Sequence, residues 1–309
     1  MPKVAGESTY PIIIDTDIGT DIDDAYALAL AIKSDLQIAG ISTVSGNTCK
    51  RGRIAKKMLV IGGKKDVPVF AGKNSRVLLT YDRWVSESEV LEVAQGVDAM
   101  IEHYWHVIEQ HQTGRVQIVA IGPLSNIAAV RERDETRFDD RAQLLMMGGS
   151  FRWRFMGMKL PEYNIFSDRR AAREIFSSRL PTRIVPLDVT ASLKLSKEDL
   201  SFLEEQARED TLLDGLLKMT AMFHSSIIGH RLPILFDPAT IIPLFDPSIL
   251  TFTKMPVEVQ RCGFTRVPKR LVHGIPDKDV CTSIDATRFY DLFFTIMTGA
   301  SQKIAKNMT

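Results

Sequence analysis

The sequence predicts an α/β fold, with an open, mostly parallel sheet covered by helices. Two observations carry this prediction. Short runs of β-branched residues alternate with helical patterns up to about residue 187, as strand–helix–strand units do. These runs are continuously apolar rather than alternating, which is typical of parallel strands buried on both faces. Active sites of such sheets lie at the carboxyl ends of the strands.

The elements follow in chain order. The first strand is the apolar run YPIII, and the helix after the second strand is basic and amphipathic. Beyond residue 196 the pattern becomes mainly helical, with a β-like stretch at 255–267 and a helix at 286–296. The sequence has no repeat and no Gly/Ser linker, so we expect one domain over residues 1–309. The expected strands are 10–14, 37–44, 67–71, 116–121, 143–147 and 183–187, and the helices between them are 24–33, 50–61, 97–112, 124–133 and 169–177.

Charge and composition exclude several classes of partner. The 309 residues include 39 Lys and Arg against 38 Asp and Glu, so no overall field attracts nucleic acid or an anionic membrane. The longest apolar stretch, 25–32, is far shorter than the ~20 residues that span a bilayer. The three cysteines are widely separated, which excludes a paired-thiolate zinc site and a disulfide framework. The N-terminus resembles no signal peptide, so we expect a cytoplasmic protein.

Three segments are rich in charged residues. We expect residues 131–141 to form a solvated loop. The segment 151–159 interleaves aromatic and basic side chains, and we interpret it as a lid beside a pocket rather than as a nucleic-acid site. A basic helix face is also expected to be solvated; its residues are Lys50, Arg51, Arg53, Lys56 and Lys57.

An acidic turn follows the first strand. Residues 15–24 contain five aspartates and no cation. Capping of the following helix accounts for two or three of them, but not for Asp15 and Asp17, which end an apolar strand. Like charges packed this closely raise one another's pKa and oppose folding unless a cation neutralises them. Oxygen-only ligands suit Ca²⁺ or Mg²⁺. The turn therefore predicts a divalent-cation site.

The other strands also end in polar or glycine-rich residues. These endings are 45–47, 122–126, 148–150 and 188–190. Because the carboxyl ends of parallel strands share one edge of the sheet, the sequence predicts a single site at that edge.

With these motifs in order, the sequence resembles the inosine-uridine-preferring nucleoside hydrolase family. The family opens with D-x-D-P-G-x-D-D-A, and a turn two residues longer also occurs among its members. That longer turn stands here as Asp15-Thr-Asp17-Ile-Gly-Thr-Asp-Ile-Asp23-Asp24-Ala25. The later steps appear as Thr43-Val-Ser-Gly-Asn47, Gly122-Pro-Leu-Ser-Asn126, Met147-Gly-Gly149, Glu162-Tyr-Asn164 with Asp168, Leu187-Asp-Val-Thr190 and Phe236-Asp237-Pro238.

The resemblance implies Ca²⁺-dependent hydrolysis of the N-glycosidic bond of a ribonucleoside. The metal ligands would be the carboxylates of Asp17, Asp24 and Asp237 and the backbone carbonyl of Ile121. Asp17 would also be the general base that deprotonates the attacking water. Family members are usually dimers or tetramers, so a homodimer or homotetramer is implied. The ribose would be bound by Asp23, Asn47, Glu162 and Asn164.

The sequence departs from the family pattern at three places. Phe236 stands where purine-cleaving relatives carry the histidine of the H-D-P step, which can protonate the leaving base. An asparagine that usually precedes the E-F-N step is missing, and Met156 stands near its place. The H-G-x-D-G-L segment is not recognisable in 74–96. Candidates for the base pocket are Phe236, His224, His230, Tyr81, Trp153 and Arg231.

Two other functions stay open. A nucleoside- or sugar-binding homologue with little or no turnover would also tolerate these losses. A phosphatase of the haloacid dehalogenase type would place its nucleophile in D-x-D-G-T, but Ile18 interrupts that pattern here. Individual residues also have ordinary structural interpretations: Asn47 as a turn residue, Glu162 and Asn164 as surface loop residues, Asp188 as a turn cap, and Asp237-Pro238 as a helix start.

Overall fold

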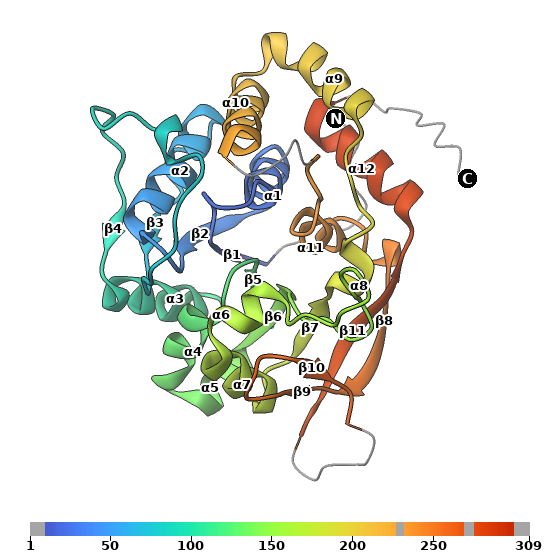
Figure 1. Ribbon diagram of the computed structural model, residues 1–309. Helices are drawn as coiled ribbons and strands as arrows, with labels where there is room; N and C mark the ends of the chain where they lie inside the picture. The colour runs from blue at the N-terminus through green and yellow to red at the C-terminus, as the bar shows by residue number, and fades with distance from the viewer. Residues whose placement is uncertain (1–9, 227–231, 269–274, 300–309) are drawn as a thin grey trace.

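The protein is seen in a computed structural model that describes residues 10–226, 232–268 and 275–299. Its centre is a nine-stranded sheet in the order β4-β3-β2-β1-β5-β6-β7-β11-β8 (Figure 1). Every neighbouring pair is parallel except β11 and β8. The predicted fold class is therefore confirmed. The strands are β1 Ile12–Thr16, β2 Ile38–Thr43, β3 Val69–Ala71, β4 Ala94–Gln95, β5 Val116–Ala120, β6 Ala142–Met147, β7 Thr182–Val185, β8 Leu250–Pro256 and β11 Asp277–Ile284, with a separate ribbon of β9 Glu258–Val259 and β10 Thr265–Arg266.

Helices cover both faces of this sheet (Figure 1). The described residues also include short 3₁₀ helices at 82–84, 207–209, 242–244 and 247–249. The α-helices are α1 Asp23–Ile32, α2 Thr48–Ile61, α3 Val97–Gln110, α4 Ser125–Glu132, α5 Glu135–Arg141, α6 Tyr163–Ser167, α7 Arg169–Ser177, α8 Leu187–Thr190, α9 Lys197–Gln206, α10 Thr211–Ser226, α11 Pro238–Ile241 and α12 Ala286–Thr298.

The apolar strands divide their side chains between two cores. Ile12 and Ile14 of β1 pack with α1, α2, α10 and α12, whereas Ile13 packs with α3, α4 and α7 on the other face. Successive strand residues point to opposite faces, so a continuous apolar run is what a doubly covered strand needs. All ten residues of α1 are buried, because this helix lies between the sheet and an outer layer of helices.

The strand order reverses beside β1, which is where sheets of this class form their ligand crevice. The chain passes from β1 to β2 on one side, and β5 pairs with β1 on the other. In open α/β sheets ligands bind where the strand order reverses in this way, outside the carboxyl ends of the strands. Asp15 lies near the end of β1, Asp17 directly follows this strand, and Ile121 directly follows β5. The fold therefore brings these three residues to one place.

The prediction of a solvated loop at 131–141 is wrong about the loop and only partly right about solvation, because residues 132–137 are exposed. The segment contains α5, and Phe138 is fully buried. Arg131 is also buried, and its guanidinium donates two hydrogen bonds to Asp139, of 2.8 and 3.1 Å. A run of charges can enter the interior when its members pair with one another.

The basic face of α2 is only partly solvated, which corrects a second prediction. Lys56 is buried, and its ammonium donates to the carbonyls of Lys65 and Val67. Arg51 has no exposed surface at all. Hydrogen bonds to backbone carbonyls compensate these cations for lost water, and composition alone gives no sign of them.

No helix within the described ranges is long and apolar enough to cross a membrane.

Candidate active site

Three buried carboxyl groups meet beside the end of β1. Asp23 and Asp24 lie in the first turn of α1, and Asp237 directly precedes α11. One carboxylate oxygen from each lies within 4.8 Å of the others. Their exposed fractions are 6, 3 and 2 %. Two of these residues were predicted as metal ligands, and Asp23 was predicted to bind ribose.

Helix capping does not occupy these side chains. Asp237 stands at the N-cap of α11 with Pro238 after it, as a common helix start does, but its side chain makes no capping hydrogen bond within the described chain. Its carboxyl group instead hydrogen-bonds with that of Asp23. Asp24 accepts a hydrogen bond of 2.5 Å from the Thr16 hydroxyl. The carboxyl groups are thus held toward one another by neighbouring elements.

Asp17 lies beside this cluster. A Cβ added at Gly122 would come within 3.1 Å of its Oδ1, so the side chain reaches the end of β5. Burial raises the pKa of Asp17 to about 6, although the charge of Arg51 opposes the shift. Conversely, the charge of Asp17 raises the pKa of Asp23, Asp24 and Asp237. The four carboxyl groups therefore form one electrostatic unit.

The donor set fits a hard divalent cation. Burial, followed by the charges of the neighbouring carboxylates, raises the pKa of Asp23, Asp24 and Asp237 well above the usual value. Two carboxyl groups in hydrogen-bonding contact must share a proton or bind a cation between them. Oxygen ligands alone are the set that Ca²⁺ prefers. The residues present therefore suit the metal that the sequence predicts.

The predicted carbonyl ligand and a predicted ribose ligand lie side by side. The Ile121 amide donates to the Asp15 carbonyl at 2.8 Å, which joins the end of β5 to β1. The Ile121 carbonyl accepts a 3.2 Å hydrogen bond from Nδ2 of Asn164, and the same nitrogen reaches the Met147 carbonyl at 3.3 Å. Since two carbonyls fix the amide nitrogen, the amide oxygen of Asn164 points away from them.

The carboxylate of Glu162 mainly accepts hydrogen bonds from backbone amides. Its carboxylate caps α6 and accepts from the amides of Asn164 and Ile165, at 2.7 and 3.0 Å. It also accepts from the Gly149 amide at 3.0 Å, which ties α6 to the loop after β6. Burial raises its pKa. The surface-loop interpretation of Glu162 and Asn164 is wrong, because both residues are buried.

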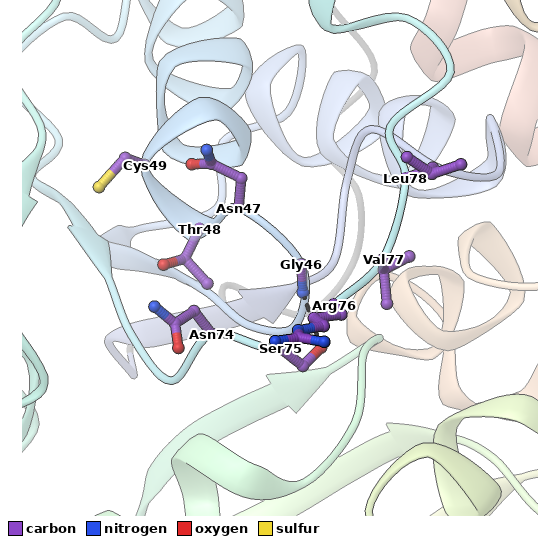
Figure 2. Close-up of a pocket in the computed structure, with 9 residues that line it drawn as sticks. All are labelled: Gly46, Asn47, Thr48, Cys49, Asn74, Ser75, Arg76, Val77 and Leu78. Carbon is purple, nitrogen blue, oxygen red and sulfur yellow. Dashed lines mark hydrogen bonds between the residues drawn. The ribbon is translucent and has the colours of Figure 1, made fainter.

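The described contacts of Asn47 are with the start of α2 and not with the acidic cluster. Its side chain is exposed and caps α2 by accepting from the Lys50 amide at 3.0 Å. It lines a cavity of about 480 Å³ between the start of α2 and the loop after β3, and Figure 2 shows the two segments facing each other. The remaining lining residues are Gly46, Thr48, Cys49, Asn74, Ser75, Arg76, Val77 and Leu78.

The candidates for the base pocket take different positions. Tyr81 is fully buried, and both functions of its hydroxyl are used: it accepts from the Gly19 amide and donates to the Asp21 carbonyl, each at 2.8 Å. Trp153 stacks on Phe155 with ring centroids 6.3 Å apart. Phe236 packs against the apolar core.

Two histidines were also candidates. His224 lies in the last turn of α10, and its Nε2 is buried without a hydrogen-bond partner among the described residues. His230 lies outside the described residues, as does Arg231.

The sequence interpretation missed two residues near the acidic cluster. One is Arg51, for which a basic helix gave no signal of burial. The other is Tyr163, the residue between Glu162 and Asn164, which is 48 % exposed. Burial and then the charge of Asp17 raise its pKa. Its signal was present in the sequence, because Tyr163 adds a hydroxyl where the E-F-N step has phenylalanine.

The aromatic–basic segment 151–159 is held at its first residues by hydrogen bonds. The carboxylate of Asp188 accepts from the amides of Phe151, Arg152 and Trp153, at 2.7, 2.6 and 3.0 Å. Asp188 thus secures the beginning of this segment, which agrees with its interpretation as a turn cap.

Comparison with known proteins gives consistent matches over this architecture. An uncharacterised protein of Schizosaccharomyces pombe is 31 % identical over 81 % of this chain and 84 % of its own length. A probable uridine nucleosidase 2 of Arabidopsis thaliana is 28 % identical, over 82 % and 83 %. The solved structure of a plant nucleoside hydrolase superposes with a TM-score of 0.78 at 26 % identity, covering 94 % of this chain and 99 % of that one.

The family model described as inosine-uridine preferring nucleoside hydrolase matches residues 12–291. This range begins at β1 and ends within α12, so it contains all the strands and the whole acidic cluster. The chain therefore belongs to the inosine-uridine preferring nucleoside hydrolase family, whose members hydrolyse the N-glycosidic bond of ribonucleosides.

Proposed function

We propose that this chain is a Ca²⁺-dependent ribonucleoside hydrolase that releases free base and ribose. The observation that carries the proposal is the contact of Asp23 with Asp237 inside a group of four buried carboxylates. Such a group is costly unless a cation binds to it. Its place at the carboxyl ends of β1 and β5 is where this fold binds ligands.

The cation would be held by Asp17, Asp24, Asp237 and the Ile121 carbonyl. When bound, it supplies positive charge that orients a water molecule and lowers its pKa. Asp23 lies in the same cluster, so it borders the metal and the sugar. The donor set uses residues directly after β1 and β5, in the first turn of α1 and directly before α11, and the packing of these elements preforms it.

Asp17 is the proposed general base. It is buried at the end of β1 and reaches toward Gly122, so it can accept a proton from a water molecule held in the crevice. Cleavage of the C1′–N bond builds positive charge on the ribose. The surrounding carboxylates stabilise that charge in a site from which bulk water is excluded.

The sugar would be bound by Asp23 and by the amide oxygen of Asn164, whose nitrogen is already fixed. Glu162 contributes mainly by holding the turn that carries Asn164, with acceptor capacity left for one hydroxyl. Asn47 would join the site only through the mouth of the cavity that it lines.

The base leaves without the histidine of the H-D-P step, because Phe236 has no proton to donate. Tyr163 and His224 are the proposed donors. Tyr163 combines solvent access with the influence of Asp17, and its raised pKa keeps the phenol protonated at neutral pH. We propose uridine as the first natural substrate, since a similar relative is named as a probable uridine nucleosidase.

A reducing-sugar assay tests this function. Purified protein is incubated with uridine, inosine, cytidine and adenosine, with Ca²⁺ present and after chelation. We expect ribose release that chelation abolishes and Ca²⁺ restores, and that Asp17→Asn lowers by about 10³-fold or more. Ribose release that chelation leaves unchanged would remove the metal from the proposal. Nucleoside binding without ribose would favour a binding homologue, and phosphate release from sugar phosphates would favour a phosphatase.

The assembly and location are also proposals. We propose a homodimer or homotetramer, as the family resemblance implies, and separately a cytoplasmic location. Sedimentation equilibrium of the full chain measures the first, and imaging of a tagged chain in its own cell measures the second.

A further inference from the structure

The acidic turn is longer than the family's short form, and it lacks the proline that stiffens that form. Ile18 stands in the proline position, and residues 17–22 connect β1 to α1. Proline restricts the backbone before folding, whereas this turn keeps that freedom. The turn nevertheless has to hold Asp17 in register with Asp23 and Asp24. Other contacts must therefore fix it.

One side of the turn is held by Arg51 of α2. Its Nη1 donates to the carbonyls of Asp17 and Ile18, the latter at 2.7 Å. Its Nη2 donates to the Thr20 hydroxyl at 2.9 Å. Its Nε donates to the Ser45 carbonyl at 2.7 Å, which anchors the guanidinium to the end of β2. Arg51 is fully buried, so these are structural hydrogen bonds and not surface contacts.

The opposite side of the turn is held by Thr80 and Tyr81. The Tyr81 hydroxyl bridges the Gly19 amide and the Asp21 carbonyl. The Thr80 amide donates to the Gly19 carbonyl at 2.7 Å, and its hydroxyl donates to the Thr20 carbonyl at 2.7 Å. Gly19 has φ of +117°, a backbone conformation that residues with a side chain rarely adopt. Glycine at this position lets the turn pass between these hydrogen-bond partners.

The loop that supports Arg51 is itself constrained. Ser45 has φ of +63°, which is unusual for a residue with a side chain. A Cβ added at the next residue, Gly46, would meet Arg51 Nη2 at 3.1 Å. Backbone in this region is strained for a residue with a side chain and persists only where its surroundings enforce it. Here the enforced conformation presents the Ser45 carbonyl to Arg51.

We infer that Arg51 and Tyr81 are positioning residues that hold the acidic turn from both sides and so fix Asp17 for metal binding and proton transfer. The metal part of this inference rests on the proposed function. Neither residue needs to touch substrate. Arginine suits the position because its planar fork serves several carbonyls at once, which the point charge of lysine does not do.

The first test compares Arg51→Lys and Tyr81→Phe with matched controls. Arg53→Lys changes an arginine two residues further along α2, whose guanidinium also donates to backbone carbonyls, those of Ser86 and Glu89. Tyr290→Phe removes a hydroxyl that donates to the Lys194 carbonyl. In folded protein we expect Ca²⁺ affinity to fall about 10–100-fold in both test variants and less than about 2-fold in the controls.

Kinetics separate positioning from substrate contact. Because the turn carries the proposed base, we expect kcat to fall by about 10-fold or more in both test variants while KM changes little. A residue in the base pocket would instead change KM and the preference among bases. A Tyr81→Phe variant with altered base preference and normal Ca²⁺ affinity would overturn the inference for Tyr81.

Hydrogen exchange of the metal-free protein gives a readout that needs no metal. Faster amide exchange of residues 18–22 is expected in Arg51→Lys and Tyr81→Phe and not in the controls. Unchanged exchange with unchanged kcat would overturn the inference. Absence of Ca²⁺ binding by the wild-type protein would refute the proposed cofactor, while the exchange rates would still decide whether the turn is held. If Arg51→Lys fails to fold, Tyr81→Phe carries the test.

Discussion

The carboxyl groups of Asp23 and Asp237 hydrogen-bond to each other, although they come from α1 and from the start of α11. Burial raises the pKa of both carboxyl groups, and the charge of Asp23 raises the pKa of Asp237 further, whereas the hydrogen bond from Asp237 partly offsets the shift of Asp23. Two buried carboxylates in contact repel unless a proton or a cation lies between them. The metal-free fold must therefore hold a proton at this contact, and the remaining carboxylates of the cluster add a repulsion that a bound cation removes.

Asp237→Asn tests this repulsion. The amide keeps the shape and a hydrogen bond to Asp23 but removes one negative charge. We expect the metal-free variant to unfold at a higher temperature than the metal-free wild-type protein. Ca²⁺ affinity should fall by more than about 100-fold, because the loss of a ligand exceeds the usual effect of an outer contact. Thermal unfolding with EDTA and then with Ca²⁺ measures both effects.

Asp246→Asn is the matched control. Asp246 is a more exposed N-cap that pairs with Arg288 and accepts from the Ser248 amide. Its replacement should lower stability slightly and equally with and without Ca²⁺. An Asp237→Asn variant that behaves in the same way would contradict a metal site at this cluster.

Sugar selectivity tests the ribose assignment. If Asp23 and Asn164 bind ribose hydroxyls, a 2′-deoxyribonucleoside leaves a buried acceptor unpaired, which costs about 1–3 kcal/mol. We expect kcat/KM for 2′-deoxyuridine to be at least about 10-fold lower than for uridine. In Asn164→Ala the difference between the two substrates should narrow if its oxygen contacts the missing hydroxyl. Equal efficiency of the wild-type enzyme on both sugars would refute the assignment.

Most of the parallel sheet could be predicted because its longer strands contain runs of apolar, mainly β-branched residues, whereas the two-residue β4 has no such run and was missed. The helix 169–177 was predicted with its observed bounds, since Asp168 caps it and its apolar face is regular. β11 was missed because its sequence, DKDVCTSI, is half polar. This strand pairs with β7 and β8, and Lys278 within it is buried by contacts with the distant carbonyls of Ser178 and Leu180. Such tertiary pairing leaves no local pattern.

The candidate site divides in the same way. The acidic turn was recognised because five aspartates exceed what capping needs. Other roles depend on contacts between segments that are far apart in the sequence. Glu162 accepts hydrogen bonds from backbone amides, and Tyr81 hydrogen-bonds to the acidic turn. Arg51 shows most clearly what the sequence does not predict. The other basic residues of α2 look the same in the sequence, and they differ from Arg51 only in the segments that pack against them.

Lys278 provides a test of pH dependence away from the site. Burial lowers its pKa to about 8, below the value of 10.5 expected in the unfolded chain. Between these values the unfolded state binds more protons than the folded state, so stability rises with pH through this window. We expect the free energy of unfolding of wild-type protein to increase relative to Lys278→Met between about pH 8 and 10.5, by up to about 3 kcal/mol. Urea titrations at several pH values measure the difference in free energy of unfolding between the two proteins. A difference that does not change with pH would contradict a lowered pKa of Lys278.

The leaving-group side gives the last prediction. Phe236 cannot donate a proton, and positioned acids contribute roughly 10²–10⁴-fold. A p-nitrophenyl riboside needs no acid, because its leaving group departs as a stable anion. We therefore expect higher relative activity on this substrate than on inosine, with Asp17→Asn abolishing both. Tyr163→Phe and His224→Gln should reduce uridine cleavage while sparing cleavage of the p-nitrophenyl riboside. The variant with the larger loss on uridine identifies the proton donor. Efficient inosine cleavage with no pH-dependent acid, unaffected by changing Tyr163, His224 or His230, would show that base departure follows another route.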